Sequence, residues 1–333
     1  MIANPKIPLR TYNYTYIQQL LADKHREKVS LPTVITIAKK HGFFLPKRER
    51  KAHDREVLTH YTGELLQHDT SFHLFAPYAD QKWYLLTTLD DYSRMLLYAR
   101  LVSQETTWAH IMAFQHVCMT QGIPLGYYVD NHSIFRFVQG RDSRWRTHAL
   151  LTDDTDPQWK QVLRDLRVKV IYALSPEAKG KIERPYRWLQ DRLVRTCARE
   201  RITRIEEAQK VLEQEEKRYN YHQVHSTTGE IPAIRFERAL RGKHSLFREF
   251  TIPYPYQSLK DIFCLRIKRT VDGYRTISIN NVKLRIHNTP LHQEVDVRIT
   301  PDDNNLCEAR IWYNGRLTDV YHLKTADLKE VHF

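Results

Sequence analysis

The sequence has few cysteines, and they follow no binding pattern. They lie at Cys118, Cys197, Cys264 and Cys307. They form no Cys-x-x-Cys pair and adjoin no cluster of cysteine and histidine. This spacing argues against a zinc finger and against a disulfide framework, and it predicts a reducing compartment.

Three further absences narrow the class of protein. The ten glycines are scattered and form no phosphate-cradling loop, which argues against a nucleotide cofactor. There is no signal-peptide pattern and no apolar run of membrane length, so we expect a cytoplasmic protein with no membrane partner. No arrangement of Ser/His/Asp or Cys/His residues suggests a protein nucleophile.

Positive charge is in excess. The formal net charge is +13 and the pI is near 9.5, which indicates an anionic partner, nucleic acid before membrane. Residues 1–55 hold twelve lysines and arginines against four acids, an excess of eight positive charges. His222 and His225 have the spacing of metal ligands, but no thiol is near them. We interpret them as solvated or facing nucleic acid, with metal binding as the alternative.

Changes of pattern along the 333 residues predict three domains, at residues 1–55, 56–240 and 255–333. The first carries two short helical patterns, and Ser30 is a good cap for the second. We predict a helix-turn-helix that binds DNA, with an ordinary helical hairpin as the alternative. Clustered cations favour DNA, because they release counterions from phosphates. The candidate contacts are Lys39, Lys40, Lys47, Arg48, Arg50 and Lys51.

Residues 56–240 alternate between strand and helix patterns. Apolar runs predict three antiparallel strands within 63–102, the first ending near Asp69. A helix over 104–121 and a strand over 125–129 follow. This order is typical of an α/β domain with a mixed sheet.

Three acids stand at the ends of these patterns. Asp69 and Asp130 each end an apolar run, and Glu183 opens a basic amphipathic segment with helical spacing. Alone, each acid is most simply a turn or cap residue, and Glu177 is a rival of Glu183. If the two strands are neighbours, Asp69 and Asp130 converge at one edge, and a helix can add the third carboxylate.

Three carboxylates close together require cations, because like charges repel and raise one another's pKa. Mg²⁺ prefers carboxylate oxygens and keeps waters for a phosphate substrate. Two ions about 3.5–4 Å apart activate the attacking oxygen and stabilise the leaving oxygen of a phosphoryl displacement. The acids therefore predict a two-Mg²⁺ site. Asp90 and Asp91, in contrast, fit the chemistry of a hairpin turn.

Residues 255–333 show only strand and turn patterns. They follow a proline- and tyrosine-rich linker at residues 252–256, and Asn314-Gly315 is a strong hairpin signal. We predict a small β-barrel or sandwich.

Several motifs together resemble those of one family. They are Gln67-His68-Asp69-Thr70-Ser71, Thr88-Leu89-Asp90-Asp91-Tyr92-Ser93-Arg94, Tyr128-Val129-Asp130-Asn131, Ser175-Pro176 with Lys179-Gly180-Lys181-Ile182-Glu183-Arg184, and Tyr219-Asn220-Tyr221-His222 with His225-Ser226. With these motifs the chain resembles the DDE transposase and retroviral-type integrase superfamily, particularly bacterial insertion-sequence transposases with an integrase catalytic core. The resemblance covers nearly the whole chain.

The resemblance implies a multidomain α/β fold: a helix-turn-helix, a ribonuclease-H-like mixed-sheet catalytic core and a C-terminal β-barrel. It implies that Asp69, Asp130 and Glu183 are the catalytic, metal-binding triad, with two Mg²⁺ ions that Mn²⁺ can replace. The implied activity is that of a DDE-type polynucleotidyl transferase, which nicks 3′ ends of element DNA and joins them to target DNA. The implied partners are double-stranded DNA and further copies of the chain, in the bacterial cytoplasm and on the nucleoid.

Basic residues near Glu183 are candidate contacts to the DNA backbone, with a solvated face as the alternative. They are Lys179, Lys181, Arg184 and Arg187. Asn131 and His132 either orient water or DNA or belong to a loop.

Two features depart from the family pattern. Asp130 and Glu183 are 53 positions apart, which is longer than the commonest spacing, and we interpret residues 136–158 as the insertion. The zinc module of retroviral integrases is absent. Two other functions stay open: a catalytically inactive DNA-binding regulator derived from a transposase, and a ribonuclease-H-like nuclease without strand transfer. The acid triad argues against the first, and DNA-binding modules at both ends argue against the second.

Overall fold

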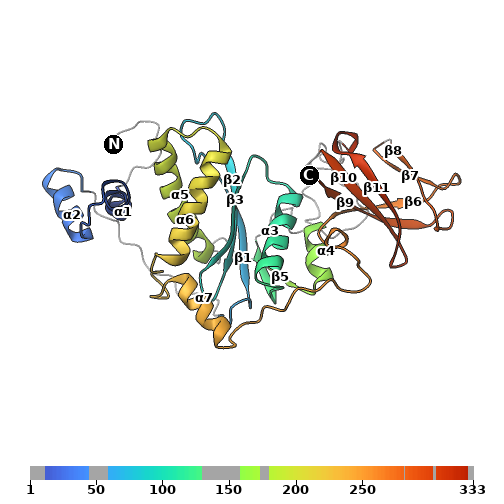
Figure 1. Ribbon diagram of the computed structural model, residues 1–333, viewed down its shortest axis with the longest axis horizontal. Helices are drawn as coiled ribbons and strands as arrows, with labels where there is room; N and C mark the ends of the chain where they lie inside the picture. Colours follow the sequence, from blue (N-terminus) through green and yellow to red (C-terminus); the bar gives the residue numbers. More distant parts are fainter. Residues whose placement is uncertain are drawn as a thin grey trace.

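The computed structural model describes residues 12–44, 59–129, 158–172, 180–280, 282–302 and 305–328, without the side chains of 180–185. Figure 1 shows two N-terminal helices, a central sheet with helices on both faces, and a group of C-terminal strands. Among the described helices, none combines the length and apolar character that crossing a bilayer needs.

The two N-terminal helices are capped by side chains. α1 (Tyr14–His25) begins after Asn13, whose side-chain oxygen accepts a hydrogen bond from the Tyr16 backbone N–H at 2.9 Å. α2 (Leu31–Lys40) begins after Ser30, the cap that the sequence predicts. The two predicted helices are present, but they do not confirm a helix-turn-helix over a helical hairpin.

The central sheet is mixed, as the sequence predicts. Its strands are β1 (Leu66–His73), β2 (Trp83–Asp90), β3 (Leu96–Val102), β4 (Gly126–Val129) and β5 (Lys169–Tyr172). They lie in the order β3-β2-β1-β4-β5. The first three are antiparallel, whereas β4 is parallel to both β1 and β5.

The prediction that the first strand ends near Asp69 is wrong. β1 continues to His73, because residues 70–73 pair with the first residues of β2, and Phe72 faces Tyr84 there. Asp69 therefore lies in the middle of a strand and opposite Thr87.

Helices cover both faces of the sheet. α3 (Thr107–Thr120) and α4 (Gln158–Asp165) pack on one face, where Phe114 and Trp159 are buried. α5 (Gly180–Glu200) and α6 (Ile205–Tyr221) cover the other face, where buried residues of the helices meet Trp83 and Leu85 of β2. The result is a helix–sheet–helix arrangement with two apolar cores (Figure 1).

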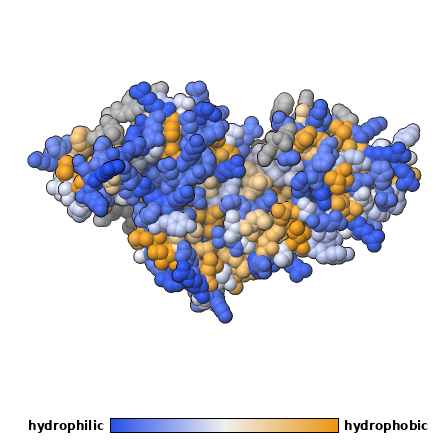
Figure 2. Space-filling model, in the orientation of Figure 1, coloured by the Kyte–Doolittle hydropathy of each residue, from blue (hydrophilic) through white to orange (hydrophobic). Residues whose placement is uncertain are grey.

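A seventh helix, α7 (Pro232–Arg241), is absent from the sequence analysis. It begins with a proline in its first turn and buries Phe236. The chain then returns to the sheet, where the Thr62 backbone exchanges hydrogen bonds with His244 and Leu246. Figure 2 shows orange, hydrophobic side chains near the corner of α6 and α7, below a largely hydrophilic face over α5 and α6.

The C-terminal residues form two sheets around one apolar core. The strands are β6 (Leu265–Thr270), β7 (Thr276–Ile279), β8 (Val282–Arg285), β9 (Glu294–Pro301), β10 (Leu306–Tyr313) and β11 (Arg316–Lys324), with short 3-10 helices η2 (Leu259–Asp261) and η3 (Thr325–Leu328). Four strands lie in the order β11-β10-β9-β6, and β7 pairs with β8. Among the described residues the four-stranded sheet does not close on itself, so the predicted barrel is not confirmed.

Candidate active site

The strand that carries Asp69 lies beside the strand that leads to Asp130. β1 and β4 pair in parallel, with Leu66 opposite Tyr127 and Gln67 opposite Tyr128. β4 ends at Val129. Asp130 itself lies outside the described residues, as do Asn131 and His132. The structure therefore shows the two strands as neighbours, which is the arrangement that the sequence argument needs.

Asp69 is half-buried and shares one side of β1 with Gln67 and Ser71, because alternate residues of a strand face the same way. The Gln67 side chain is only 2% exposed, and its Nε2 donates to Asp91 Oδ1 at 2.5 Å. Its Oε1 is buried with no hydrogen-bond partner. A buried amide oxygen without a donor is costly unless water or a ligand satisfies it.

α5 crosses this same side of β1. Gln190 Nε2 donates to Ser71 Oγ at 2.5 Å. Tyr186, Leu189 and Leu193 of α5 are buried, which confirms the apolar stripe that the sequence predicts. The helix that contains Glu183 thus packs on the strand that contains Asp69.

Glu183 lies in the first turns of α5, and its side chain is outside what the structure describes. Its rival Glu177 is also outside the described residues. Within the described part of the chain, no three His, Cys, Asp or Glu side chains gather as a metal-binding group. Of the three predicted ligands, only the Asp69 side chain belongs to that part.

Behind Asp69, the opposite side of β1 holds a buried chain of hydrogen bonds. His68 Nδ1 lies 2.8 Å from Thr88 Oγ1, and His68 Nε2 lies 2.8 Å from His110 Nδ1 on α3. His110 Nε2 lies 3.1 Å from Glu105 Oε1. A consistent assignment has each group donate towards the Glu105 carboxylate. These contacts fix the position of β1 against α3, and the sequence analysis did not find them.

The turn acids behave as the sequence predicts. Asp90 is completely buried and accepts hydrogen bonds from Thr62 Oγ1, from the Gly63 backbone N–H and from Ser93. Burial raises the pKa of Asp90. Asp91 pairs with Arg94 at 3.0 Å. Both acids thus hold the turn and tie it to the start of β1 and the residues before it.

The predicted DNA contacts are described only in part. Lys39 and Lys40 are exposed at the end of α2, and Lys39 Nζ lies 4.8 Å from the centre of the Phe44 ring. Arg187 is exposed on α5. The remaining candidates lie outside the described residues or, for two in the first turns of α5, outside the described side chains: Lys47, Arg48, Arg50, Lys51, Lys179, Lys181 and Arg184.

Sequence relatives carry the transposase name. The chain is 25% identical over 304 residues to the "Putative transposase y4bF" of Sinorhizobium fredii (strain NBRC 101917 / NGR234), which covers 84% of this chain and 62% of the relative. It is 28% identical over 159 residues to the "Transposase for insertion sequence IS1202" of Streptococcus pneumoniae, over 48% of this chain and 32% of the relative. The chain is thus similar to proteins named as transposases. No protein-family model matches it. It spans under two thirds of the length of either relative.

Solved structures of retroviral proteins are also similar. The HTLV-2 integrase catalytic core domain in complex with magnesium (trimeric form) matches with a TM-score of 0.39 and 16% identity, over 55% of this chain and 99% of that chain. A simian T-cell lymphotropic virus intasome, in complex with PP2A regulatory subunit B56 gamma, matches with a TM-score of 0.42 and 14% identity, over 91% of this chain and 98% of that chain. At these scores the likeness supports no conclusion about activity.

Proposed function

We propose that this chain is a DNA transposase that nicks 3′ ends of element DNA and joins them to target DNA with the help of divalent metal ions. The observation that carries the proposal is the pairing of β1 with β4, which brings the Asp69 strand beside the strand that ends just before Asp130. The transposase relatives give the reaction class.

The register of the two strands supports Asp69 and Asp130 as a pair. Gln67 lies opposite Tyr128. Two further steps along each strand lead to Asp69 and to Asp130. Facing positions of neighbouring strands are about 5 Å apart, so two carboxylates there can share a metal ion.

The direction of α5 supports Glu183 as the third carboxylate. From the contact of Gln190 with Ser71, Asp69 lies two residues back along β1, about 7 Å, and Glu183 lies two turns back along α5, about 10 Å. Seven residues bring Glu183 to the same side of the helix as Gln190.

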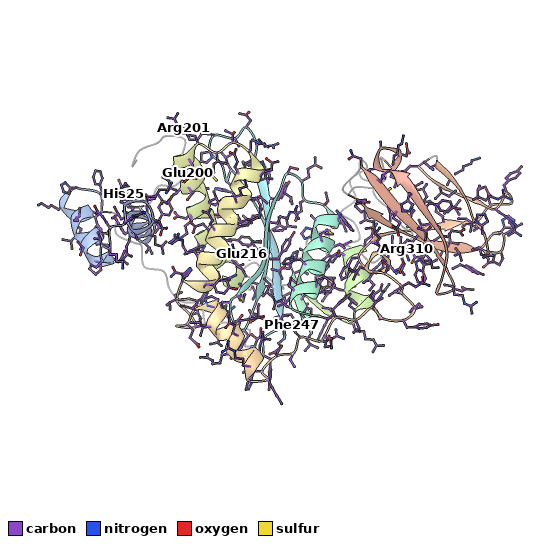
Figure 3. All side chains as sticks on the ribbon, viewed as in Figure 1. His25, Glu200, Arg201, Glu216, Phe247 and Arg310 are labelled. Atoms are coloured by element: carbon purple, nitrogen blue, oxygen red, sulfur yellow. The ribbon has the colours of Figure 1, made fainter. Side chains whose placement is uncertain are left out.

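β1 and α5 run in the same general direction, so both acids lie on the same side of this contact. Phe247 adjoins Gly63, just before β1, and lies at the lower edge of Figure 3. Glu200 ends α5 and lies near the top of the same view. Asp69 and Glu183 thus each precede this contact along their own element.

The donor set suits Mg²⁺, with Mn²⁺ as a substitute. Three carboxylates supply the oxygen ligands that hard cations prefer. Gln67 Oε1, buried on the Asp69 side of β1 without a partner, is an acceptor for a water of a bound ion. Two bound ions would activate the attacking oxygen and stabilise the leaving one. Asp69, Asp130 and Glu183 would hold them.

DNA binding is assigned to the N-terminal helices and to the basic start of α5. α1 docks on the central helices, since Tyr16 Oη lies 3.0 Å from Thr196 Oγ1 and Arg218 pairs with Asp23 at 2.6 Å. α2 is left with Lys39 and Lys40 exposed. We therefore propose α2 as the helix that meets DNA, in a multimer that holds two element ends on one target.

The test is a nicking and joining assay with native element ends, a plasmid target and Mg²⁺. Wild type should nick and join, and Asp130→Ala should lose both while it keeps DNA binding. Binding without nicking by a folded wild-type protein would favour the regulator derived from a transposase. Nicking without joining would favour the nuclease. Full joining by Asp130→Ala would contradict the assignment of the triad.

A further inference from the structure

β1 and β2 form a ribbon whose open end carries an exposed aromatic face. Beyond the last pair of β1 with β4, at Gln67 and Tyr128, β1 continues to His73 with β2 as its partner. Phe72 lies near this end, and its side chain is 54% exposed. It follows Asp69 by three residues, about 10 Å along the strand, and because that spacing is odd it lies on the opposite side of β1, the side of His68.

Phe72 is half of a stacked pair. It lies opposite Tyr84 of β2, and the two rings are 4.4 Å apart with an angle of 27° between their planes. Tyr84 is half-buried, so it supports Phe72 from one side. A ring held by a stacked neighbour presents a rigid, flat surface, which loses little conformational freedom when a planar ligand binds.

The surroundings of this pair are basic. Lys82 is exposed, and its Nζ lies 5.6 Å from the centre of the Phe72 ring. Arg100 is exposed in the next cross-strand row, opposite Leu86 of β2. Flat aromatic rings with cations beside them are the chemistry of proteins that bind unpaired nucleotides, where bases stack on rings and phosphates meet cations.

We propose that Phe72, Tyr84 and Lys82 form a stacking site for an unpaired DNA base at the end of the β1–β2 ribbon, on the side of the sheet opposite Asp69. The base stacks on Phe72 and takes the place of the Lys82 ammonium, which then contacts the neighbouring phosphate. The site would hold an unpaired stretch of the DNA whose phosphodiester is processed at Asp69, on the other side of the sheet. This inference rests on the proposed function, because it assumes DNA at Asp69.

The test compares unpaired and paired DNA as ligands of the full chain. The probes are a fluorescein-labelled oligothymidylate and a blunt duplex of mixed sequence. Phe72→Ala should weaken oligothymidylate binding about tenfold and duplex binding by less than about twofold, while Phe72→Trp restores binding. Tyr274→Ala is the matched control, since Tyr274 is an aromatic residue 88% exposed in a distant turn. It should change neither affinity.

A fluorescent base gives a readout that a merely structural role would not change. 2-Aminopurine at an unpaired end should be quenched by stacking when wild type binds, and should stay bright with Phe72→Ala. Lys82→Gln should weaken binding of the oligothymidylate and should lower the slope of log affinity against log salt concentration by about one released counterion. Quenching of 2-aminopurine should be retained.

The outcomes separate this proposal from the proposed function. If wild type joins DNA but Phe72→Ala binds the oligothymidylate and quenches 2-aminopurine like wild type, the stacking site is wrong and the transposase proposal stands. If Phe72→Ala dissociates a multimer without changing quenching, the ring is a contact between copies of the chain, and the stacking proposal is again wrong. If wild type binds neither probe, both proposals fail.

Discussion

At the scale of single residues, acids of the same type serve different purposes. Asp90 is wholly buried and surrounded by donors from Thr62, Gly63 and Ser93, so it holds a turn. Asp69 is half-buried in the middle of β1, on the side that α5 covers. The neighbouring residues therefore distinguish a structural carboxylate from a candidate catalytic one. The residue type alone does not reveal this difference.

Glu216 on α6 (Figure 3) gives a prediction about pH and stability. Burial and, to a lesser extent, the nearby Glu213 raise the pKa of Glu216 to about 7. Lys217 has a smaller, opposite effect on this pKa. Because the folded pKa lies above the unfolded one, Glu216 stabilises the fold at low pH, and this contribution is lost as pH rises from about 4.5 to about 7.

We expect the free energy of unfolding of Glu216→Gln to rise by about 1–3 kcal/mol relative to wild type across that pH range. This value is reduced to allow for partial solvent screening. Urea unfolding of both proteins at a series of pH values measures the difference. If the free energies of unfolding of the two proteins changed in parallel from acid to neutral pH, Glu216 would not titrate as described.

At the scale of elements, much of the central fold can be predicted from the sequence. The apolar run at 83–89 predicts β2, and the spacing of Tyr186, Leu189 and Leu193 predicts the buried face of α5; both are confirmed. The adjacency of β1 and β4, which the argument from the acids assumed, is also present, although β1 does not end on its acid.

Other elements depend on partners that are distant in sequence. Residues 70–73 are mostly polar and suggest a loop, and only their pairing with β2 makes them part of β1. α7 is short and carries three arginines among its apolar residues, and Phe236 packs against Phe247 in the core beneath it. The contact of His68 with His110 joins residues 42 positions apart and has no signal in the local pattern.

The packing of α5 on β1 gives a prediction at this scale. Gln190→Ala removes the hydrogen bond to Ser71 and should lower stability by only about 0.5–1.5 kcal/mol. Because it frees the helix that contains Glu183, it should reduce strand transfer by at least about tenfold, with DNA binding unchanged.

The matched control is Gln209→Ala, which removes the hydrogen bond that the Leu101 backbone N–H donates to Gln209 Oε1 on α6. It should have a similar cost in stability and little effect on transfer. Equal losses of transfer in the two variants would contradict a special role for the contact of α5 with β1.

At the scale of the whole molecule, a buried ion pair joins the central fold to the C-terminal sheets. Asp165 of α4 accepts hydrogen bonds from Arg266 of β6 at 2.6 Å and from Tyr256 Oη at 2.9 Å. Arg266 is almost fully buried, and its interactions with Cys264 and Asp165 raise its pKa against the opposing effect of burial. The C-terminal strands are thus held to α4 by a charge that has little access to water.

Removing one partner of this pair should be costly. We expect Asp165→Ala to destabilise the protein by about 3–5 kcal/mol, because the Arg266 charge stays buried without its partner. Asp165→Ala with Arg266→Met should recover much of that loss. Denaturant unfolding measures both, and a double variant no more stable than Asp165→Ala would show that the charge is not the cause.

The central claim is that Asp69, Asp130 and Glu183 act as one metal-dependent site. The most direct measurement is strand transfer of pre-nicked element ends into a plasmid with Mg²⁺, by wild type and by Asp69→Asn, Asp130→Asn and Glu183→Gln. We expect joined products from wild type alone, with all four proteins bound to the ends. Joined products from the Glu183→Gln protein at the wild-type level would contradict the claim.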